Sequence, residues 1–205
     1  MRTNKSSHTA DEALALFREH GGTLRTGEAL ALGIHPRTLY RLRDDGLLEQ
    51  LARGLYRLAD LPPLDHPDLV TVARQVPRGV ICLISALAFY ELTTQVPHAV
   101  DVALQRGDER PRLTHPPLRV FWYAKEAWEA GIRTHDVGNT LVRIYSPAKS
   151  VADALKFRRR IGVDVAIEAL RNHVRSPAFR SDELLHYARI CRVEGVLHSY
   201  LEALA

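Results

Sequence analysis

Residues 33–43 constrain the fold of this chain more than any other stretch of its sequence. Gly33 allows the backbone to turn within very few residues, and Pro36 suits the first turn of a helix, where its missing N–H leaves no hydrogen bond unmade. Leu39 and Leu42 then lie on one helical face, three residues apart. The segment therefore predicts the turn and the second helix of a helix-turn-helix unit.

The same predicted helix has a second, polar face. Arg37, Tyr40, Arg41 and Asp44 recur at i, i+3, i+4 and i+7, so they form a stripe separate from the leucines. Guanidinium groups pair with guanine in the DNA major groove and also bind phosphates. This stripe is typical of a recognition helix, with Arg37 and Arg41 as first candidates for base contacts.

A short hairpin is predicted to follow this helix. Beyond Gly46, residues 48–51 and 55–58 can pair about a turn at residues 52–54, which places Arg53 at the tip, within reach of the DNA backbone or minor groove. A helix-turn-helix with such a hairpin is a winged helix. The candidate DNA-binding residues are Arg25, Thr26, His35, Arg37, Thr38, Tyr40, Arg41, Arg43 and Arg53.

Capping signals mark the helices on either side of the predicted turn. Thr9 and Glu12 have the spacing of a capping box, and Gly21 and Gly22 end that first helix. Thr26 can cap the second, short helix. Helix starts carry backbone donors that favour phosphate, which is why Arg25, Thr26 and His35 join the candidate set; Thr38 and Tyr40 could contact a phosphate or a thymine methyl group.

The proline-rich residues 61–67 predict a boundary between a domain at residues 1–61 and another at residues 66–205. Residues 80–84 fit either a buried strand or the start of a helix, and Ser146 and Pro147 should begin the first of three or four final helices. We expect an α+β fold: a winged helix-turn-helix, then a mixed α/β domain with a small, mainly antiparallel sheet and C-terminal helices. Its strand candidates are residues 100–104, 118–123, 132–137 and 140–145.

Charge and cysteine content narrow the class of protein. The net charge of +4 and the pI near 9.3 permit a polyanionic partner, but residues 1–60 hold nine Lys or Arg against eight Asp or Glu. DNA binding therefore depends on placement, and the competing interpretation is a helical module whose arginines are merely solvated. Cys82 and Cys191 lack CxxC partners, and no apolar run could span a bilayer, so we expect a cytoplasmic protein without a membrane partner.

Enzyme motifs have no positive support in this sequence. Asp101 lies on a predicted strand, but residues 104–106 supply no acid-x-Lys pair of a nuclease. No HExxH motif, nucleophile elbow or glycine-rich phosphate loop is present, and lone histidines such as His98 and His115 are more often structural or solvated. We expect no catalytic residues, no metal site and no cofactor.

A second basic run, residues 156–160, lies on the helix predicted after Ser146. Such a run is usually a solvated helix end; the alternative is a docking face for a partner protein or a second phosphate contact. The candidate partner-facing residues are Lys149, Asp153, Lys156, Arg158, Arg159 and Arg160.

Both parts of the chain resemble the AbiEi family of antitoxins. In the first domain the resemblance rests on residues 21–26, 33–34, 38–42, 45–48 and 53–56, and in the second on residues 151–158, 161–162 and 166–170. On this resemblance the DNA-contacting helix falls on residues 35–45 and the wing on residues 48–58, and His35 stands where related chains often have a serine-like cap.

The resemblance implies a type IV toxin–antitoxin system and a function for each domain. The winged helix would bind double-stranded operator DNA at inverted repeats and repress its own operon, with two copies on DNA even if the free protein is a monomer. The second domain would antagonise a co-encoded nucleotidyltransferase toxin, directly or functionally. Two alternatives remain open at this stage: a DNA-binding, metal-dependent nuclease that uses Asp101, and a ligand-responsive regulator without a toxin.

Overall fold

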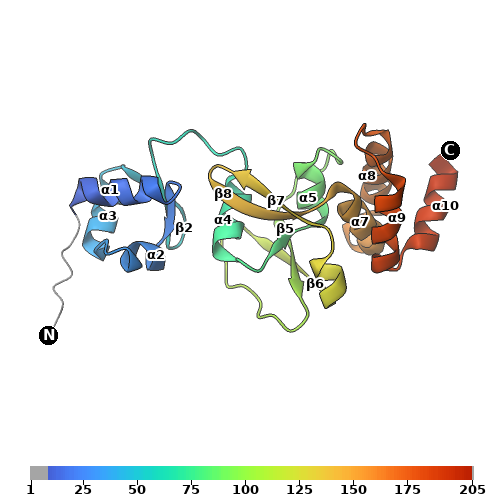
Figure 1. Cartoon of the computed structure of the whole chain (residues 1–205), viewed down its shortest axis with the longest axis horizontal. Coiled ribbons are helices and arrows are strands. Elements are labelled where there is room, and N and C mark those ends of the chain that lie inside the picture. Colours follow the sequence, from blue (N-terminus) through green and yellow to red (C-terminus); the bar gives the residue numbers. More distant parts are fainter. Residues whose placement is uncertain (1–8, 205) are drawn as a thin grey trace. The chain divides into compact units, whose positions relative to one another are not determined.

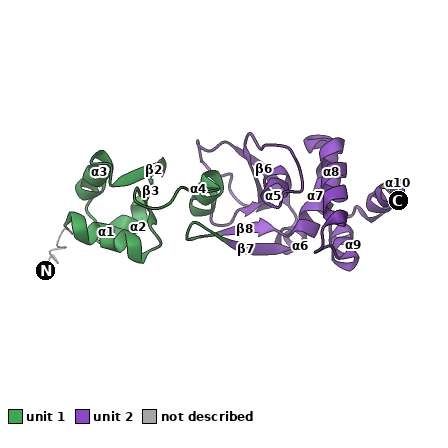
Figure 2. Cartoon of the chain, turned by 90° about the horizontal axis from the view of Figure 1, so that it is seen from above, with its two compact units in different colours: residues 1–75, 136–141 green, residues 76–135, 142–205 purple. Residues whose placement is uncertain are grey.

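The computed structural model describes residues 9–204 and has the predicted α+β fold, with an N-terminal winged helix and C-terminal helices (Figure 1). Its contacts divide the chain into two compact units, shown in Figure 2. The first unit contains residues 1–75 and 136–141, and the second contains residues 76–135 and 142–205, of which residues 1–8 and 205 lie outside the described range. The domain boundary between residues 61 and 66 stays a prediction.

The first unit is a winged helix followed by one further helix. Its elements are α1 (Ala10–Glu19), β1 (Thr23–Arg25), α2 (Thr26–Ala31), α3 (Pro36–Asp44), β2 (Leu48–Ala52), β3 (Leu55–Leu58) and α4 (Pro67–Gln75). The three strands form an antiparallel sheet in the order β1-β3-β2. The predicted hairpin is thus confirmed, and β1 completes it as a third strand that was not predicted.

Local signals place the helices of this unit as expected, with one shift. At α1 the capping box is present: the Glu12 N–H donates to the Thr9 hydroxyl (3.3 Å) and the Thr9 N–H donates to the Glu12 carboxylate (2.7 Å). The cap of α2 is Arg25 rather than Thr26, because the Arg25 N–H donates to the Glu28 carboxylate (2.7 Å). Phe17 and neighbouring apolar side chains of α1, α2, α3 and the sheet then form one buried core.

The second unit combines a sheet with helices before and after it. Its elements are β4 (Val80–Ile81), α5 (Leu83–Phe89), β5 (Val100–Gln105), β6 (Leu118–Tyr123), α6 (Lys125–Glu129), β7 (Ile132–Val137), β8 (Thr140–Tyr145), α7 (Pro147–Ile161), α8 (Val163–Arg175), α9 (Ser181–Cys191) and α10 (Glu194–Leu204). The four predicted strands are present, and residues 80–84 divide between a short strand and the start of a helix.

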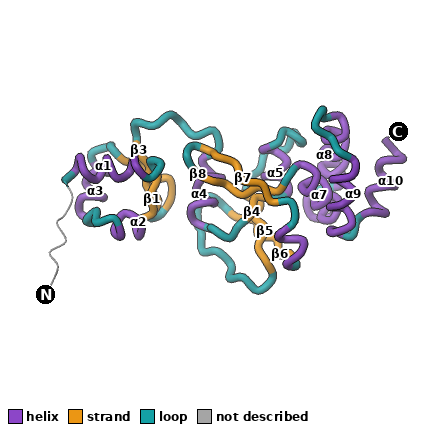
Figure 3. Tube along the Cα trace, viewed as in Figure 1, coloured by secondary structure: helices purple, strands orange, loops and turns teal. Residues whose placement is uncertain are grey.

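The sheet of the second unit is mixed, which corrects the expectation that it is mainly antiparallel. In the order β6-β5-β4-β8-β7, the β4–β5 pair is antiparallel, whereas β5–β6 and β4–β8 are parallel. Parallel neighbours need a crossover of about a dozen residues, and the irregular residues 106–117 supply one between β5 and β6 (Figure 3). The alternation of apolar residues shows which side chains of a strand are buried, but it does not show whether neighbouring strands run parallel or antiparallel.

Helix α7 lies at the centre of the helical part of this unit. It packs against α5, α8 and α9, and its buried side chains join those of the sheet in a single apolar cluster. The predicted start is confirmed, because the Lys149 N–H donates to the Ser146 hydroxyl (3.3 Å) and Pro147 occupies the first turn. Within residues 9–204, no helix has the length and apolar character needed to cross a membrane.

Candidate nucleic-acid interface

Helix α3 begins at an unusual but effective cap. The Arg37 N–H donates to Nδ1 of His35 (3.2 Å), so the imidazole does what a serine or asparagine oxygen does at most helix starts. Accepting at Nδ1 requires the neutral ring with its proton on Nε2. Pro36 follows at the first helical position. His35 therefore holds the start of the helix.

The two faces of α3 separate as the spacing predicted. Leu39 and Leu42 are completely buried in the core, whereas Arg37, Tyr40 and Arg41 are exposed. The buried leucines fix the rotation of the helix about its axis, because their burial contributes about 1.5–3 kcal/mol each. Fixing that rotation aims the two arginines and the tyrosine at solvent together.

The structure corrects the prediction that the side chain of Thr38 contacts DNA. Only 9% of Thr38 is exposed, so it lies with the core-facing residues and not on the polar stripe. The physical reason is its spacing from Leu42: residues i and i+4 lie on the same face of a helix, so Thr38 lies beside that buried leucine. A side-chain contact from Thr38 to DNA has no support in this geometry.

Arg43 is held within its own helix. Its Nε and Nη2 both donate to the Asp44 carboxylate (2.9 and 2.6 Å), and its guanidinium lies 5.4 Å from the centre of the Tyr40 ring. The hydrogen bond to Asp44 raises the pKa of Arg43 above its ordinary value. Among the described residues, Arg37 and Arg41 have no such ion pair. They are the cations of this face that are open to an external partner.

The wing and the start of α2 lie against each other. Gly54 adopts a positive φ of 73° in the turn between β2 and β3, a conformation that favours glycine, and Arg53 beside it is exposed. Both the N–H (2.8 Å) and the hydroxyl (3.4 Å) of Thr26 donate to the Gly54 carbonyl. Thr26 thus braces the wing turn, with half-buried Arg25 next to it in the chain.

The structure divides the predicted partner-facing residues into two groups. The prediction that Lys149 and Asp153 face a partner is wrong. Both side chains are fully buried and are joined by an ion pair of 2.6 Å. Asp153 also accepts a hydrogen bond from the Cys191 thiol (3.1 Å), and the Lys149 ammonium lies 4.0 Å from the centre of the Tyr145 ring. Packing of α7 from several sides encloses this half of the helix.

The end of α7 remains at the surface. Lys156, Arg159 and Arg160 are exposed, and Arg158 is partly exposed while it donates to the Leu155 carbonyl (2.7 Å). The Arg160 guanidinium lies 4.3 Å from the centre of the Phe121 ring, on the edge strand β6. These four basic residues form a surface that a negatively charged partner could contact.

Asp101, the acid considered for a nuclease, is already engaged. It is completely buried; Arg119 donates to both of its oxygens (2.5 and 2.8 Å), and the Ile84 N–H also donates to it (3.0 Å). Burial raises the pKa of the Asp101 carboxyl, while the Arg119 hydrogen bonds act in the opposite direction. Across the described part of the chain, no cluster of three or more His, Cys, Asp or Glu residues could hold a metal ion. The arrangement gives Asp101 a structural role.

Comparison with known proteins supports the interpretation of the first unit. Residues 11–59 match the family model of the AbiEi antitoxin transcriptional regulators, which confirms the predicted resemblance over the winged helix. The whole fold is similar to the crystal structure of the Rv2827c protein from Mycobacterium tuberculosis: the TM-score is 0.55 and the identity 13%, over 96% of this chain and 82% of that chain. No curated protein matches this chain.

Proposed function

We propose that this chain is an autoregulating antitoxin of a type IV, AbiE-like system, on the premise that its winged-helix segment is that of an AbiEi antitoxin transcriptional regulator. The family supports a regulatory rather than an enzymatic role. The observation that carries the DNA-binding part is the exposed stripe of Arg37, Tyr40 and Arg41 on a helix whose opposite face is locked in the core.

In this proposal α3 enters the major groove of the operator, and the wing contacts the backbone or minor groove. Arg37 and Arg41 contact base edges, Tyr40 a phosphate or a thymine methyl group, and Arg53 the sugar–phosphate backbone. Two copies bind an inverted repeat upstream of the operon and repress it, because each copy reads one half-site.

The test is a binding titration with the duplex upstream of the gene and a random duplex of equal length. Arg41→Ala should weaken operator binding by about 1–3 kcal/mol and random binding much less, since a base contact is lost. Arg53→Ala should weaken both and reduce the slope of log K against log salt by about one unit, since a phosphate contact is lost. Arg18→Ala is the matched control, because that exposed arginine of α1 pairs with Asp60 and is not among the candidate DNA-binding residues.

Equal affinities of the wild type and all three variants for both duplexes would contradict the assignment of α3. Equal losses on the operator and the random duplex for Arg41→Ala would show that Arg41 contacts phosphate and not a base.

We assign antagonism of a nucleotidyltransferase toxin to the second unit. Its support is the resemblance of residues 151–158, 161–162 and 166–170 to the second domain of AbiEi antitoxins and the basic surface at the end of α7. Lys156, Arg158, Arg159 and Arg160 would contact the toxin, or the negatively charged target for which both proteins compete.

A co-expression experiment separates the two functions within the full chain. The nucleotidyltransferase encoded next to this gene is induced together with variants of this chain, and cell growth is measured. A Lys156→Glu/Arg160→Glu variant should lose rescue and retain operator binding, whereas Arg41→Ala should retain rescue. Arg171→Glu, an exposed change on α8, is the control. Full rescue by the double variant would exclude this surface, and the lack of an adjacent nucleotidyltransferase gene would favour a regulator without a toxin.

A further inference from the structure

A small cavity lies in the second unit, away from the basic surface of α7. It has a volume of about 200 Å³, and residues from three helices and one strand of the unit, together with the loops next to them, line it. Tyr90, Arg133, Pro147, His173 and Glu183 are the lining residues that carry the argument. Since a water molecule occupies about 30 Å³ of liquid, the cavity holds a ligand of about seven non-hydrogen atoms.

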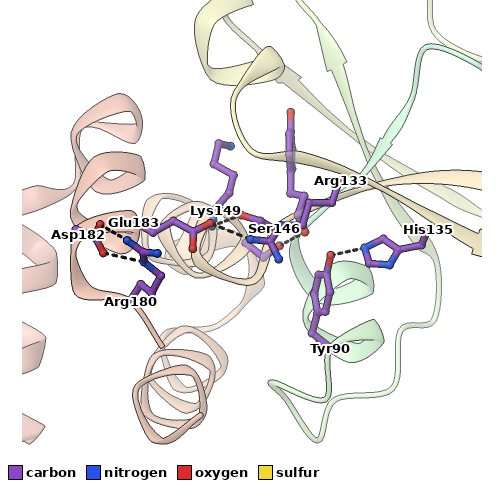
Figure 4. Close-up of polar contacts among 10 residues, drawn as sticks. Tyr90, Arg133, His135, Ser146, Lys149, Arg180, Asp182 and Glu183 are labelled. Atoms are coloured by element: carbon purple, nitrogen blue, oxygen red, sulfur yellow. Dashed lines mark hydrogen bonds and ion pairs between the residues drawn. The ribbon is translucent and has the colours of Figure 1, made fainter. Parts of the chain in front are cut away.

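Opposite charges meet at this cavity. Arg133 Nη2 lies 3.2 Å from Glu183 Oε1, and the two side chains are 52% and 26% exposed (Figure 4). Among the described residues this is the one ion pair of either side chain, so the second Glu183 oxygen and the other Arg133 nitrogens remain open. A ligand that carries both charges can bind here without leaving either residue uncompensated.

His173 adds an unused polar group. It is 4% exposed, its ring packs edge-on against Phe179, and its Nε2 has no hydrogen-bond partner within residues 9–204. Buried polar atoms are almost always paired, because an unpaired one has lost its hydrogen bonds to water without replacement. Burial lowers the pKa of His173, so the ring is neutral and can accept or donate. His173 lines the cavity with other atoms, since Nε2 itself is shielded from solvent.

The start of α7 contributes a further preference for negative charge. Ser146 caps this 15-residue helix, and Pro147, its first residue, lines the cavity. The N-terminus of a helix carries a partial positive charge, which stabilises a carboxylate nearby. Glu183, which also lines the cavity, lies in the first turn of α9 and supplies the group that an ammonium prefers.

Tyr90 is an uncharged part of the cavity wall. Burial raises the pKa of Tyr90 to about 12 and lowers the pKa of His135, and the Tyr90 hydroxyl forms a hydrogen bond with Nε2 of His135 (2.8 Å; Figure 4). This hydrogen bond uses both groups internally. The charge recognition of the cavity therefore comes from Arg133, Glu183 and the start of α7.

We propose that this cavity binds a small zwitterion, with the chemistry of a free amino acid of the size of glycine, alanine, serine or threonine. The ligand carboxylate contacts Arg133 and the start of α7. The ligand ammonium contacts Glu183. The proposal does not depend on the toxin or on the operator, and it gives the second unit a site for a small molecule.

Titration of the ¹⁵N-labelled full chain with L-alanine, followed by NMR, tests the proposal, with glycine, L-serine and L-threonine titrated in parallel. We expect saturable shifts of backbone amides around residues 133, 173 and 183. Propionate lacks the ammonium and ethylamine lacks the carboxylate, so each should bind at least tenfold more weakly than L-alanine. Arg133→Gln and Glu183→Gln should each weaken binding at least tenfold, whereas Arg171→Gln, an exposed change on α8, should leave it unchanged.

His173→Phe should weaken binding as well, because the larger ring narrows the cavity that His173 lines. If this buried change impairs folding, Arg133→Gln and Glu183→Gln still test the proposal. The proposal is overturned if none of the four amino acids causes a saturable shift at concentrations up to about 20 mM. It is also overturned where propionate binds as tightly as L-alanine, or where neither Arg133→Gln nor Glu183→Gln weakens binding.

Discussion

Helices α3 and α7 share the same local signals but hold their charged residues in opposite ways. Each begins with a capping residue followed by proline, and each carries basic residues in its last turn. In α3 the charged side chains lie outside and the leucines inside. In α7 Lys149 and Asp153 are as completely buried as the neighbouring Val151. A helix covered on one face can be interpreted from its own periodicity, whereas a helix enclosed by α5, α8 and α9 cannot.

The largest effect should come from breaking the ion pair inside α7. Asp153→Ala leaves the Lys149 ammonium buried without its carboxylate and removes the acceptor of the Cys191 thiol. We expect a loss of about 3–5 kcal/mol from the unfolding free energy of the second unit. Trp122 and Trp128, the two tryptophans of the chain, both lie in that unit, so their fluorescence during urea unfolding reports it selectively.

The double variant Lys149→Met/Asp153→Leu is the control for this comparison. It removes both charges and keeps apolar volume, so its stability should lie near that of the wild type. A loss as large as that of Asp153→Ala would show that the shape of the site, and not its unpaired charge, causes the instability.

The cap of α3 should give a smaller effect confined to the first unit. His35→Ala removes the acceptor of the Arg37 N–H and should cost about 0.5–2 kcal/mol. The helix signal in circular dichroism, at about 222 nm, follows this unfolding, while the tryptophan fluorescence should not change. His35→Asn, which supplies a preferred capping oxygen, should restore the stability. Failure of asparagine to restore it would show that the ring packs rather than caps.

The smallest expected effect is a pH dependence in the second unit. Burial lowers the pKa of His173 below its ordinary value of 6.5, so below about pH 6.5 the unfolded state binds more protons than the folded state. The unfolding free energy should therefore fall as the pH decreases through this range and recover above it. His135, whose pKa burial also lowers, adds to the same slope.

Urea unfolding followed by fluorescence measures this slope between about pH 5 and 8, the range in which histidines titrate. His173→Phe should flatten the curve without removing it, because His135 still titrates. If His173→Phe has the same slope as the wild type, His173 does not contribute to the pH dependence of the unfolding free energy.

Much of the fold could be predicted where one face of an element is buried and the other is exposed. The strands at residues 118–123, 132–137 and 140–145 were predicted with the bounds that the structure has. Strand β1 was not predicted, because its three residues are too few to show an alternation. The parallel pairing of β5 with β6 also escaped prediction, because both pairing directions bury the same alternate residues.

The sequence by itself determined the winged helix and its exposed arginines, since capping, turn geometry and the spacing of Leu39 and Leu42 are local properties that act within a few residues. Only the tertiary structure decided that Lys149 and Asp153 pair inside the second unit, and that Arg133, His173 and Glu183 meet around one cavity. These residues come from elements far apart in the chain, or are enclosed by such elements. Their burial and proximity arise from packing, which no local pattern records.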